Sequence, residues 1–375
     1  MAQSIDKIHP SDLITSRERI MAAYQGQPVD RIPYWPKVTN ANWRTGQNQH
    51  IAAMSEMELL DYIGADGLFG AKFATRIVRP KVTVEEMPVP NGRITVTHTP
   101  DGDLTERWIF DPQTKSWHPT EFPIKTLEDV GRFRWRYENV SIENDEQSLA
   151  AMRQKVKMIG QRGVCEHWWG TSPLMDLVEH SLGPVDTTYM LMDYPREMEE
   201  LMELMHAECL MRAAHVARHT PGDIVVSGEN TSTTLISPQQ FEKYCYRHLC
   251  EYGRAIEAAG KIHQLHMCGH ILPLLQTIDT IPAASIEAFT SPPLGSARLA
   301  DGRAKAPSKA LIGGTNVMNW LLPVEKIKAY IHGELEACPN HRRIVLTTAG
   351  VAPQACSAQT FRQIGQWLAA YPAKM

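Results

Sequence analysis

The sequence predicts an α/β protein: a (β/α)8 barrel of the TIM type with a β-hairpin insertion near the N-terminus. From about residue 155 onward, short apolar segments alternate with helical segments five times in succession, which indicates a parallel sheet. The apolar segments carry polar residues at their C-terminal ends, where such a barrel places its active site. A doubly wound open sheet is the competing architecture, and the lack of a GxGxxG motif after the first strand disfavours it.

The β insertion is expected over residues 76–120, where polar and apolar residues alternate. The stretch "PNGR" inside it is a hairpin turn signal. This segment interrupts the strand–helix order without the composition of a linker, so residues 1–375 are predicted to form a single barrel domain.

The remaining elements follow from periodicity and from end signals. "VDRIPYW" (29–35) and "KVKMIGQRG" (155–163) are predicted strands, and residues 54–67 contain a short helix that ends at Gly64. A capping box of Ser237 and Gln240 starts a helix that stops at Gly260. Further strands are predicted at 223–230, 261–269, 284–289, 309–317 and 343–350, and further helices at 195–219, 271–278, 323–338 and 357–372.

Composition excludes several classes of function. The net charge is −4 with acids and bases mixed, and no basic block suggests a nucleic-acid partner. No apolar run reaches the roughly 18 residues of a membrane helix, and the N-terminus lacks an apolar signal core, so a cytoplasmic location is expected. The seven cysteines form no CxxC pair, so each is expected to be core filler, ligand or nucleophile.

The stretch "GKIHQLHMCGHILPLL" (260–275) contains the strongest candidate site. His266 and Cys268 are two residues apart at the end of a predicted strand, so their side chains point to the same face. Imidazole and thiolate are the commonest zinc ligands, and a catalytic zinc needs three protein ligands and an open position. The alternative is a buried cysteine beside a hydrogen-bonded histidine without metal. His263 has odd separation from both and is expected to face away.

Other predicted strands also end in polar residues. Glu229 and Asn230 follow "DIVVSG", Glu287 lies in "ASIEAF", and Thr347 and Thr348 lie in "RIVLTTAG". Because the carboxyl ends of parallel strands meet at one rim, these side chains are expected near His266 and Cys268.

Five segments, in order, resemble the uroporphyrinogen decarboxylase superfamily: "DRIPYWP", "LISPQQFEKY", "KIHQLHMCGHILPLL", "IGGTNV" and "TTAGVAP". The resemblance covers residues 15–372 and is greatest to zinc-dependent, corrinoid-linked methyltransferases, among them the methylcobamide:coenzyme M methyltransferases. The decarboxylases carry an MRQAGR-like segment after the first strand. This chain has "YWPKVTNANWR" there, with only Lys37 and Arg44, too little positive charge for a substrate with eight carboxylates.

The resemblance implies a zinc-dependent transfer of a methyl group between a methylated corrinoid and a thiol or folate-type acceptor. It implies that His266 and Cys268 are zinc ligands. The family's third ligand is a cysteine in the last barrel loop, where this chain has Ala349. Two replacements are open: Cys356, seven residues later, or Glu229, which could instead orient His266.

The catalytic residues expected from this resemblance are Glu229 and Asn230, and the cofactor-binding residues are Trp168, Trp169 and Asn316. The two tryptophans can equally be core. The chain has no DxHxxG motif, so cobalamin is expected on a separate corrinoid protein. Family members commonly dimerise, and a homodimer is expected. The alternative function is other chemistry on the same fold, such as decarboxylation or demethylation of a methoxylated compound, and a non-enzymatic metal-binding barrel is a third.

Overall fold

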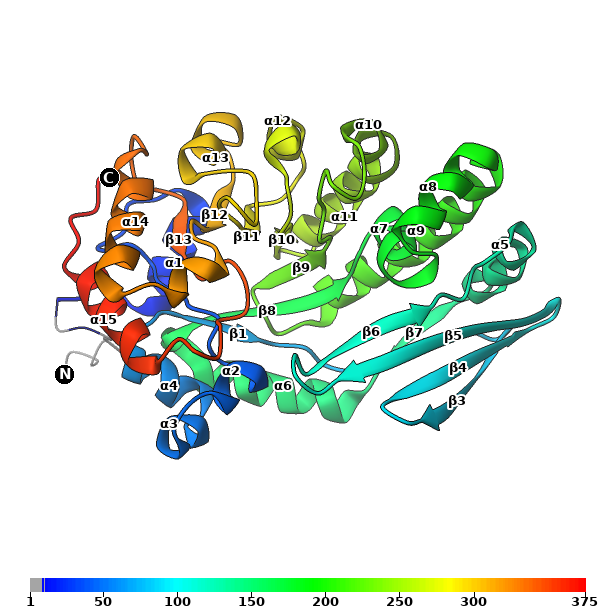
Figure 1. The fold of residues 1–375 in the computed structure, drawn as a ribbon, viewed down its shortest axis with the longest axis horizontal. Coiled ribbons are helices and arrows are strands. Elements are labelled where there is room, and N and C mark those ends of the chain that lie inside the picture. The colour runs from blue at the N-terminus through cyan, green and yellow to red at the C-terminus, as the bar shows by residue number, and fades with distance from the viewer. Residues whose placement is uncertain (1–8, 10) are drawn as a thin grey trace.

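The core of the molecule is a curled, entirely parallel sheet of seven strands in the order β1-β8-β9-β10-β11-β12-β13 (Figure 1). The computed structural model describes residue 9 and residues 11–375. The strands are β1 (Gly67–Gly70), β8 (Gly163–Gly170), β9 (Ile224–Gly228), β10 (Ile262–His266), β11 (Ser285–Phe289), β12 (Ala310–Gly313) and β13 (Ile344–Leu346).

The predicted strand in "VDRIPYW" is a single bridge between Tyr34 and Leu346. Leu346 N–H donates to the Pro33 carbonyl at 2.8 Å, and Trp35 N–H donates to the Leu346 carbonyl at 2.9 Å. On the other side, Asp66 N–H donates to the Tyr34 carbonyl at 2.7 Å. Residues 33–35 therefore bond to β13 and to the residue before β1. The predicted curled parallel sheet is confirmed, with seven regular strands where the sequence predicts an eight-stranded barrel.

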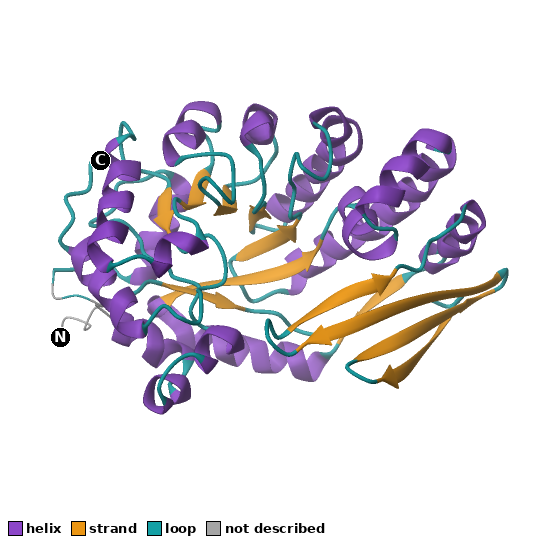
Figure 2. Ribbon diagram, in the orientation of Figure 1, coloured by secondary structure: helices purple, strands orange, loops and turns teal. Residues whose placement is uncertain are grey.

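Helices pack around the curled sheet, most of them on its outside (Figure 2). They are α1 (Ser16–Gln25), α2 (Ala41–Thr45), α3 (Gln49–Ala53), α4 (Glu56–Ile63), α5 (Leu127–Arg134), α6 (Glu146–Ile159), α7 (Pro173–Asp176), α8 (Pro184–Asp193), α9 (Pro195–His219), α10 (Pro238–Gln240), α11 (Arg247–Ala258), α12 (Leu275–Asp279), α13 (Leu299–Lys305), α14 (Val324–Glu336) and α15 (Ala358–Ala369). Short 3-10 or π turns are η1 (Trp135–Tyr137), η2 (Gly160–Arg162), η3 (Leu177–Ser181), η4 (Phe241–Tyr246), η5 (Leu272–Leu274) and η6 (Val317–Leu321). None of these described helices has the length and apolar character of a membrane span.

Helix α1 packs against the residues inside the curled sheet. Its Ile20, Ala23 and Tyr24 share one buried cluster with side chains from five strands and from Trp35. The inward residues alternate along each strand, as pleating requires: Leu68, Val164, Ile224, Val226, Ala310, Ile312 and Val345. This apolar layer leaves the polar inward positions near the C-terminal strand ends.

One predicted strand is wrong. Residues 155–159 of "KVKMIGQRG" belong to α6, whose N-cap Asp145 accepts from Ser148 N–H. The local alternation was misleading because Leu149 and Ile159 lie on the buried face of this helix, with Met152 and Val156 packed against the same core. The strand itself is β8, which begins at Gly163.

The insertion is larger than the predicted hairpin. It is a four-stranded antiparallel sheet of β3 (Thr83–Val89), β4 (Gly92–Thr99), β5 (Gly102–Asp111) and β6 (Ser116–Glu121), beside a pair formed by β2 (Thr75–Val78) and β7 (Ser141–Asn144). The turn predicted at "PNGR" joins β3 to β4, with Asn91 at a φ of 54°. Figure 1 shows this sheet projecting beside β8, and the single-domain organisation stays a prediction.

A buried ionic cluster joins the N-terminal elements to the sheet. Asp66, fully buried just before β1, accepts from Arg19 Nη1 of α1 at 2.7 Å and from Arg31 Nη1 at 2.8 Å. It also accepts from Tyr34 N–H at 3.0 Å. Burial alone would raise the pKa of Asp66, but the two guanidinium groups hold it far below its usual range. One carboxylate therefore fixes α1, the 33–35 segment and β1 together.

We predict that Asp66→Ala lowers the free energy of unfolding by about 3–5 kcal/mol, because it removes a fully buried carboxylate from two buried guanidinium groups, which keep only Asp12 and Asp30 as partners. The measurement is urea unfolding at neutral pH. The matched control is Arg76→Gln, which breaks the exposed Arg76–Glu143 pair (2.8 Å) and should cost less than about 1 kcal/mol. Equal effects of the two substitutions would contradict the role assigned to Asp66.

Candidate active site at the C-terminal ends of the strands

Three charged side chains form a line inside the strand ends. His266, at the end of β10, contacts the Glu287 carboxylate of β11 through its Nδ1 atom, and Lys37 Nζ contacts the second oxygen of that carboxylate. Lys37 follows directly after the 33–35 segment. Glu287 is fully buried, and the side chain of His266 is 14% exposed. The line therefore runs from Lys37, after the 33–35 segment, to Glu287 on β11 and then to His266 on the neighbouring strand β10.

Charge pairing decides the protonation of this line. Burial by itself would lower the pKa of His266, but the Glu287 carboxylate and a hydrogen bond with Cys268 raise it to about 9. Burial would raise the pKa of Glu287, but Lys37 and His266 lower it to about 2. At neutral pH, His266 is therefore an imidazolium held between a carboxylate and a thiol.

Cys268 lies on the same side as His266, as the two-residue spacing predicts. Its Sγ atom donates to Asn230 Oδ1 at 3.4 Å, and Asn230 Nδ2 donates to Glu179 Oε2 at 2.9 Å. All seven cysteines are free thiols, and six of them are buried while Cys268 is half-buried. His263 faces the opposite side of β10, where it bonds to Ser227 Oγ (2.9 Å). The accessible thiol is therefore the one beside His266.

Trp168 forms one wall of this site from the neighbouring strand β8. Its ring centroid lies 4.8 Å from that of His266, and its indole N–H donates to Glu166 Oε1 at 2.8 Å. Trp168 is 38% exposed. A Cβ atom at Gly228 would lie 3.3 Å from the Trp168 ring, so this glycine leaves room for it. Trp168 thus offers an accessible aromatic surface beside the imidazolium.

A second carboxyl lies beneath Trp168. Glu166 accepts from Gln264 Nε2 at 3.0 Å, and Gln264 in turn accepts from Tyr24 of α1. Burial, together with the nearby charge of Glu287, raises the pKa of Glu166 to about 7. Hydrogen bonds therefore connect Glu166 and Gln264, beneath the site, to Tyr24 of helix α1.

Backbone strain gathers at the same rim. Asn230, Ala288 and Ala349 have φ values of 45°, 58° and 52°, in the left-handed region that costs a non-glycine residue roughly 1–2 kcal/mol. They stand at the ends of β9, β11 and β13. Such strain concentrates where a fold holds side chains in a functional arrangement. Ala288 lies at the register shift that follows Glu287.

Two expected third ligands lie elsewhere. The Glu229 carboxylate is fully buried and accepts from Ser172 N–H (2.8 Å) and Ser172 Oγ (2.5 Å), and burial raises its pKa to about 7. Cys356 is buried beside Thr360, burial raises its pKa to about 12, and its carbonyl accepts from Trp43 Nε1 at 2.9 Å. The structure therefore places neither side chain beside His266 and Cys268, since pleating turns Glu229 outward and the last loop packs Cys356 into the core.

Two expected cofactor contacts are structural. Trp169 is buried on the outer face of β8, where its indole N–H donates to Ser227 Oγ at 2.9 Å. Asn316 is buried, and its Oδ1 accepts from Met318 N–H (3.0 Å) and caps η6. Its Nδ2 donates to the Pro292 carbonyl at 2.8 Å. The amide of Asn316 is occupied by the fold, and of the three residues Trp168 contacts His266 while Trp169 only lines the neighbouring cavity.

The sequence-level reasoning missed three members of the site. The sequence indicated Glu287 as a polar residue at a strand end but assigned it no role. It indicated Lys37 only as an isolated basic residue after the first predicted strand. Glu179 follows "SPLMDLV" in the π turn η3, where no spacing rule signals a functional carboxylate.

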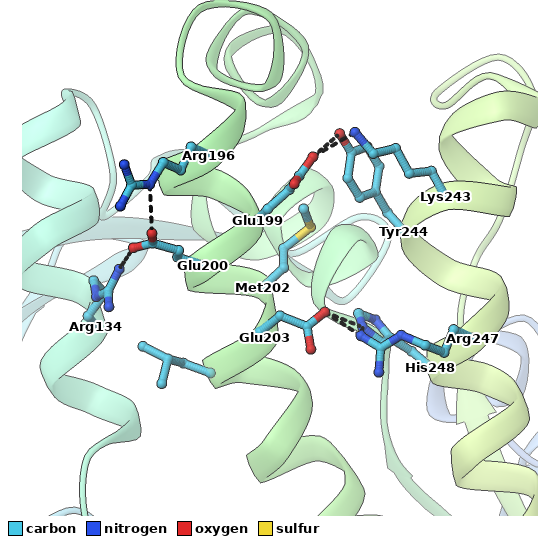
Figure 3. A pocket seen from close by; sticks show the side chains of 11 residues that line it. Arg134, Arg196, Glu199, Glu200, Met202, Glu203, Lys243, Tyr244, Arg247 and His248 are labelled. Atoms are coloured by element: carbon cyan, nitrogen blue, oxygen red, sulfur yellow. Dashed lines mark hydrogen bonds and ion pairs between the residues drawn. The ribbon is translucent and has the colours of Figure 1, made fainter.

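A cavity of about 520 Å³ opens beside the site. Trp168, Asn230 and Glu179 line it, with α9 and the insertion on the other sides. A second hollow, of about 580 Å³, lies outside the barrel between α9 and α11. There each carboxylate meets a base or hydroxyl: Glu200 meets Arg134 and Arg196, Glu199 meets Lys243 and Tyr244, and Glu203 meets Arg247 and His248 (Figure 3). The cavity beside Trp168 is therefore the candidate substrate site.

The model of the uroporphyrinogen decarboxylase (URO-D) family matches residues 174–359, which include Asn230, His266, Cys268 and Glu287. The chain belongs to the uroporphyrinogen decarboxylase superfamily. Among solved structures, a methyltransferase from Methanosarcina mazei has the same fold, with a TM-score of 0.58 and 15% identity, over 95% of this chain and 98% of that one. None of the curated proteins matches the sequence.

The donor chemistry of the site fits zinc in part. A metal-binding histidine commonly has its other nitrogen held by a carboxylate, as Glu287 holds His266. Among the described residues, no three histidine, cysteine or acidic side chains gather as a complete metal site. Glu179 Oε1, however, is buried and has no hydrogen-bond partner in the described chain. The side-chain amide of Asn230 connects the Glu179 carboxylate to Cys268 through two hydrogen bonds. Two side chains of ligand type therefore lie together, and one carboxylate oxygen nearby is uncommitted.

We predict that Glu287→Gln lowers the pKa of His266 from about 9 toward its ordinary value of 6.5, because burial and Lys37 are then opposed only by the hydrogen bond with Cys268. The measurement is an NMR titration of the His266 ring protons. A raised folded-state pKa stabilises the fold below pH 6.5, and this contribution is lost as the pH rises through about 9. The stability of the wild type should therefore decline over that range, and the variant should decline less. An unchanged His266 titration would contradict this electrostatic account.

Proposed function

We propose that this chain is a methyltransferase that moves a methyl group between a methylated corrinoid, carried by a partner protein, and a thiol or folate-type acceptor. The observation that carries the proposal is the contact of Cys268 with His266 inside the strand ends of a uroporphyrinogen decarboxylase-type fold. The Methanosarcina mazei methyltransferase of the same fold supports the reaction class. The corrinoid and the acceptor are expectations from the family resemblance.

The residues of the site suit chemistry at sulfur. Glu287, which also pairs with Lys37, holds the His266 ring in one orientation through Nδ1, so that the rest of the ring faces the Cys268 sulfur. Asn230 accepts from Cys268 and fixes its position. The half-exposed ring of Trp168 offers a flat apolar surface to a bulky methyl carrier and keeps water from that side of the thiol.

Zinc is part of the proposal. His266 and Cys268 would hold it, and Glu179 would complete the three protein ligands. A bound zinc deprotonates a coordinated thiol, so it supplies a thiolate at neutral pH. The arrangement around it is built by the protein alone: Glu287 orients the imidazole, and Asn230 links the cysteine to Glu179.

The rim of the site supports a protein partner. Exposed apolar side chains stand on the segments that follow β9, β11, β12 and β13: Leu235, Leu294, Met318, Leu321, Leu322 and Val351, which are 38–52% exposed. Isolated exposed apolar residues are ordinary, but a set placed around one opening is typical of an interaction surface. We propose that the corrinoid protein docks on this rim.

The function is tested with methylcobalamin and 2-mercaptoethanol. We expect the wild type, loaded with zinc, to demethylate the corrinoid, followed by its change in visible absorbance. Cys268→Ala should lower the rate by more than about 100-fold, beyond the effect of residues that only support a metal site. Cys338→Ala is the control, because this buried thiol at the end of α14 bonds only to the Glu334 carbonyl (3.4 Å). Equal rates for the two variants, or no turnover by the wild type with either a thiol or a folate acceptor, would contradict the proposal.

Metal content tests the ligand set separately. We predict about one zinc per wild-type chain by elemental analysis, and its loss in Cys268→Ala and in Glu179→Ala. Cys356→Ala and Glu229→Gln should keep their zinc, because both side chains are committed to the core. Circular dichroism shows whether each variant is folded. Zinc loss in Cys356→Ala with retention in Glu179→Ala would overturn the assignment of the third ligand.

A further inference from the structure

We infer that the cavity beside Trp168 binds a small organic carboxylate with an apolar body, and that Arg212 holds its carboxylate group. This deepens the proposed function, since it assigns a chemical class to the small molecule that gives or receives the methyl group. The cavity, of about 520 Å³, lies within the range of sites that enclose small molecules. The inference depends on where the cavity lies, on the charges around it and on its apolar walls.

The cavity is in direct reach of the proposed chemistry. Trp168 lines it and contacts His266 with ring centroids 4.8 Å apart. Asn230 also lines it and accepts the hydrogen bond from Cys268 at 3.4 Å. A molecule in this cavity is therefore separated from the imidazolium and the thiol by one side chain. The hollow between α9 and α11 has no such connection.

At the α9 wall, two arginines share one carboxylate. Glu208, buried in α9, forms a close pair with Arg79 at 2.6 Å. Arg212, one turn further along, has its Nη1 atom 3.9 Å from Glu208, beyond hydrogen-bond distance, while its Nη2 donates to the Trp169 carbonyl at 2.8 Å. The guanidinium of Arg212 is thus held in place by one nitrogen and leaves the other for a ligand.

Two further bases line the cavity without an ion pair to any described residue: Arg136, stacked over the Phe133 ring at 4.8 Å, and Lys72. The acids are Glu106 and Asp176, besides Glu208 and Glu179. Asp176 accepts from Ser181 Oγ at 2.6 Å, and Glu179 Oε2 accepts from Asn230 Nδ2 at 2.9 Å. The wall near Arg212 therefore favours an anion, which a planar guanidinium binds with two parallel hydrogen bonds.

Part of the remaining wall is apolar and aromatic. Phe133, Tyr137, Met205 and Trp169 line the cavity together with the exposed ring of Trp168. Such walls bury the flat or branched hydrocarbon part of a ligand, while a few polar groups fix its orientation. A ligand with a carboxylate at one end and an apolar body fits both parts. The apolar body would then extend toward Trp168 and the thiol.

The test is calorimetric titration of the full-length protein with benzoate and with benzamide, its uncharged counterpart of the same shape. We expect benzoate to bind more tightly than benzamide. Arg212→Gln should weaken benzoate binding about 10- to 100-fold, the effect of losing a charged hydrogen-bond pair, and should remove the preference over benzamide. Arg196→Gln is the matched control on the same helix, because its side chain is 86% exposed and pairs with Glu200; it should leave binding unchanged.

Arg136→Gln, on α5's side of the cavity, is the second variant and should also weaken benzoate binding if Arg212→Gln does not fold. Benzoate and benzamide binding equally, neither binding at millimolar concentration, or both arginine variants binding benzoate as the wild type does would each overturn the inference. The methyl-transfer assay can fail independently of this test. Benzoate binding without methyl transfer would support the anion site and contradict the proposed function. Methyl transfer without benzoate binding would support the proposed function and contradict the anion site.

Discussion

The buried carboxylate of Asp66 is the constraint on which the rest of the structure depends. It binds Arg19 of α1 and Arg31, and it accepts the backbone N–H of Tyr34. The 33–35 segment makes only a single bridge to β13, so its position depends on these bonds rather than on a long strand ladder. Lys37 comes two residues after that segment and reaches Glu287, which holds His266. A charge cluster at the N-terminal end of the chain thus positions the base that sets the charge of the site.

Strand alternation decides which residues can take part. On β8, Trp168 faces inward beside His266, and Trp169 faces outward against Tyr252. On β10, His266 faces inward and His263 outward. The same rule continues into Glu229, whose carboxylate turns outward to Ser172 just after the inward Gly228. Functional and structural residues of the same type therefore stand side by side in the sequence and lie on opposite faces of the sheet.

The sequence predicted much of this arrangement and missed particular parts for physical reasons. Helix α9 was predicted at its full length because its apolar spacing is long and its start is a proline. The pairing of His266 with Cys268 followed from the two-residue repeat of a strand. The strand predicted at 155–163 was wrong because five alternating residues also fit one face of α6. Glu287 was expected near the site as a polar strand end, but its pairing with His266 and Lys37, and the part of Glu179, could not be predicted from the sequence, because these contacts span long separations and depend on how the sheet curls.

The central claim is that Cys268 and His266 form one chemical unit, in which the imidazolium contacts the only cysteine that is not buried. The most direct measurement is the rate at which iodoacetamide alkylates each cysteine at neutral pH in protein stripped of metal, followed by peptide mass spectrometry. The account predicts that Cys268 reacts first in the wild type and reacts much more slowly in His266→Gln, while the other six cysteines keep their rates. An unchanged rate at Cys268 after removal of the imidazole, or faster reaction at a buried cysteine, would contradict it.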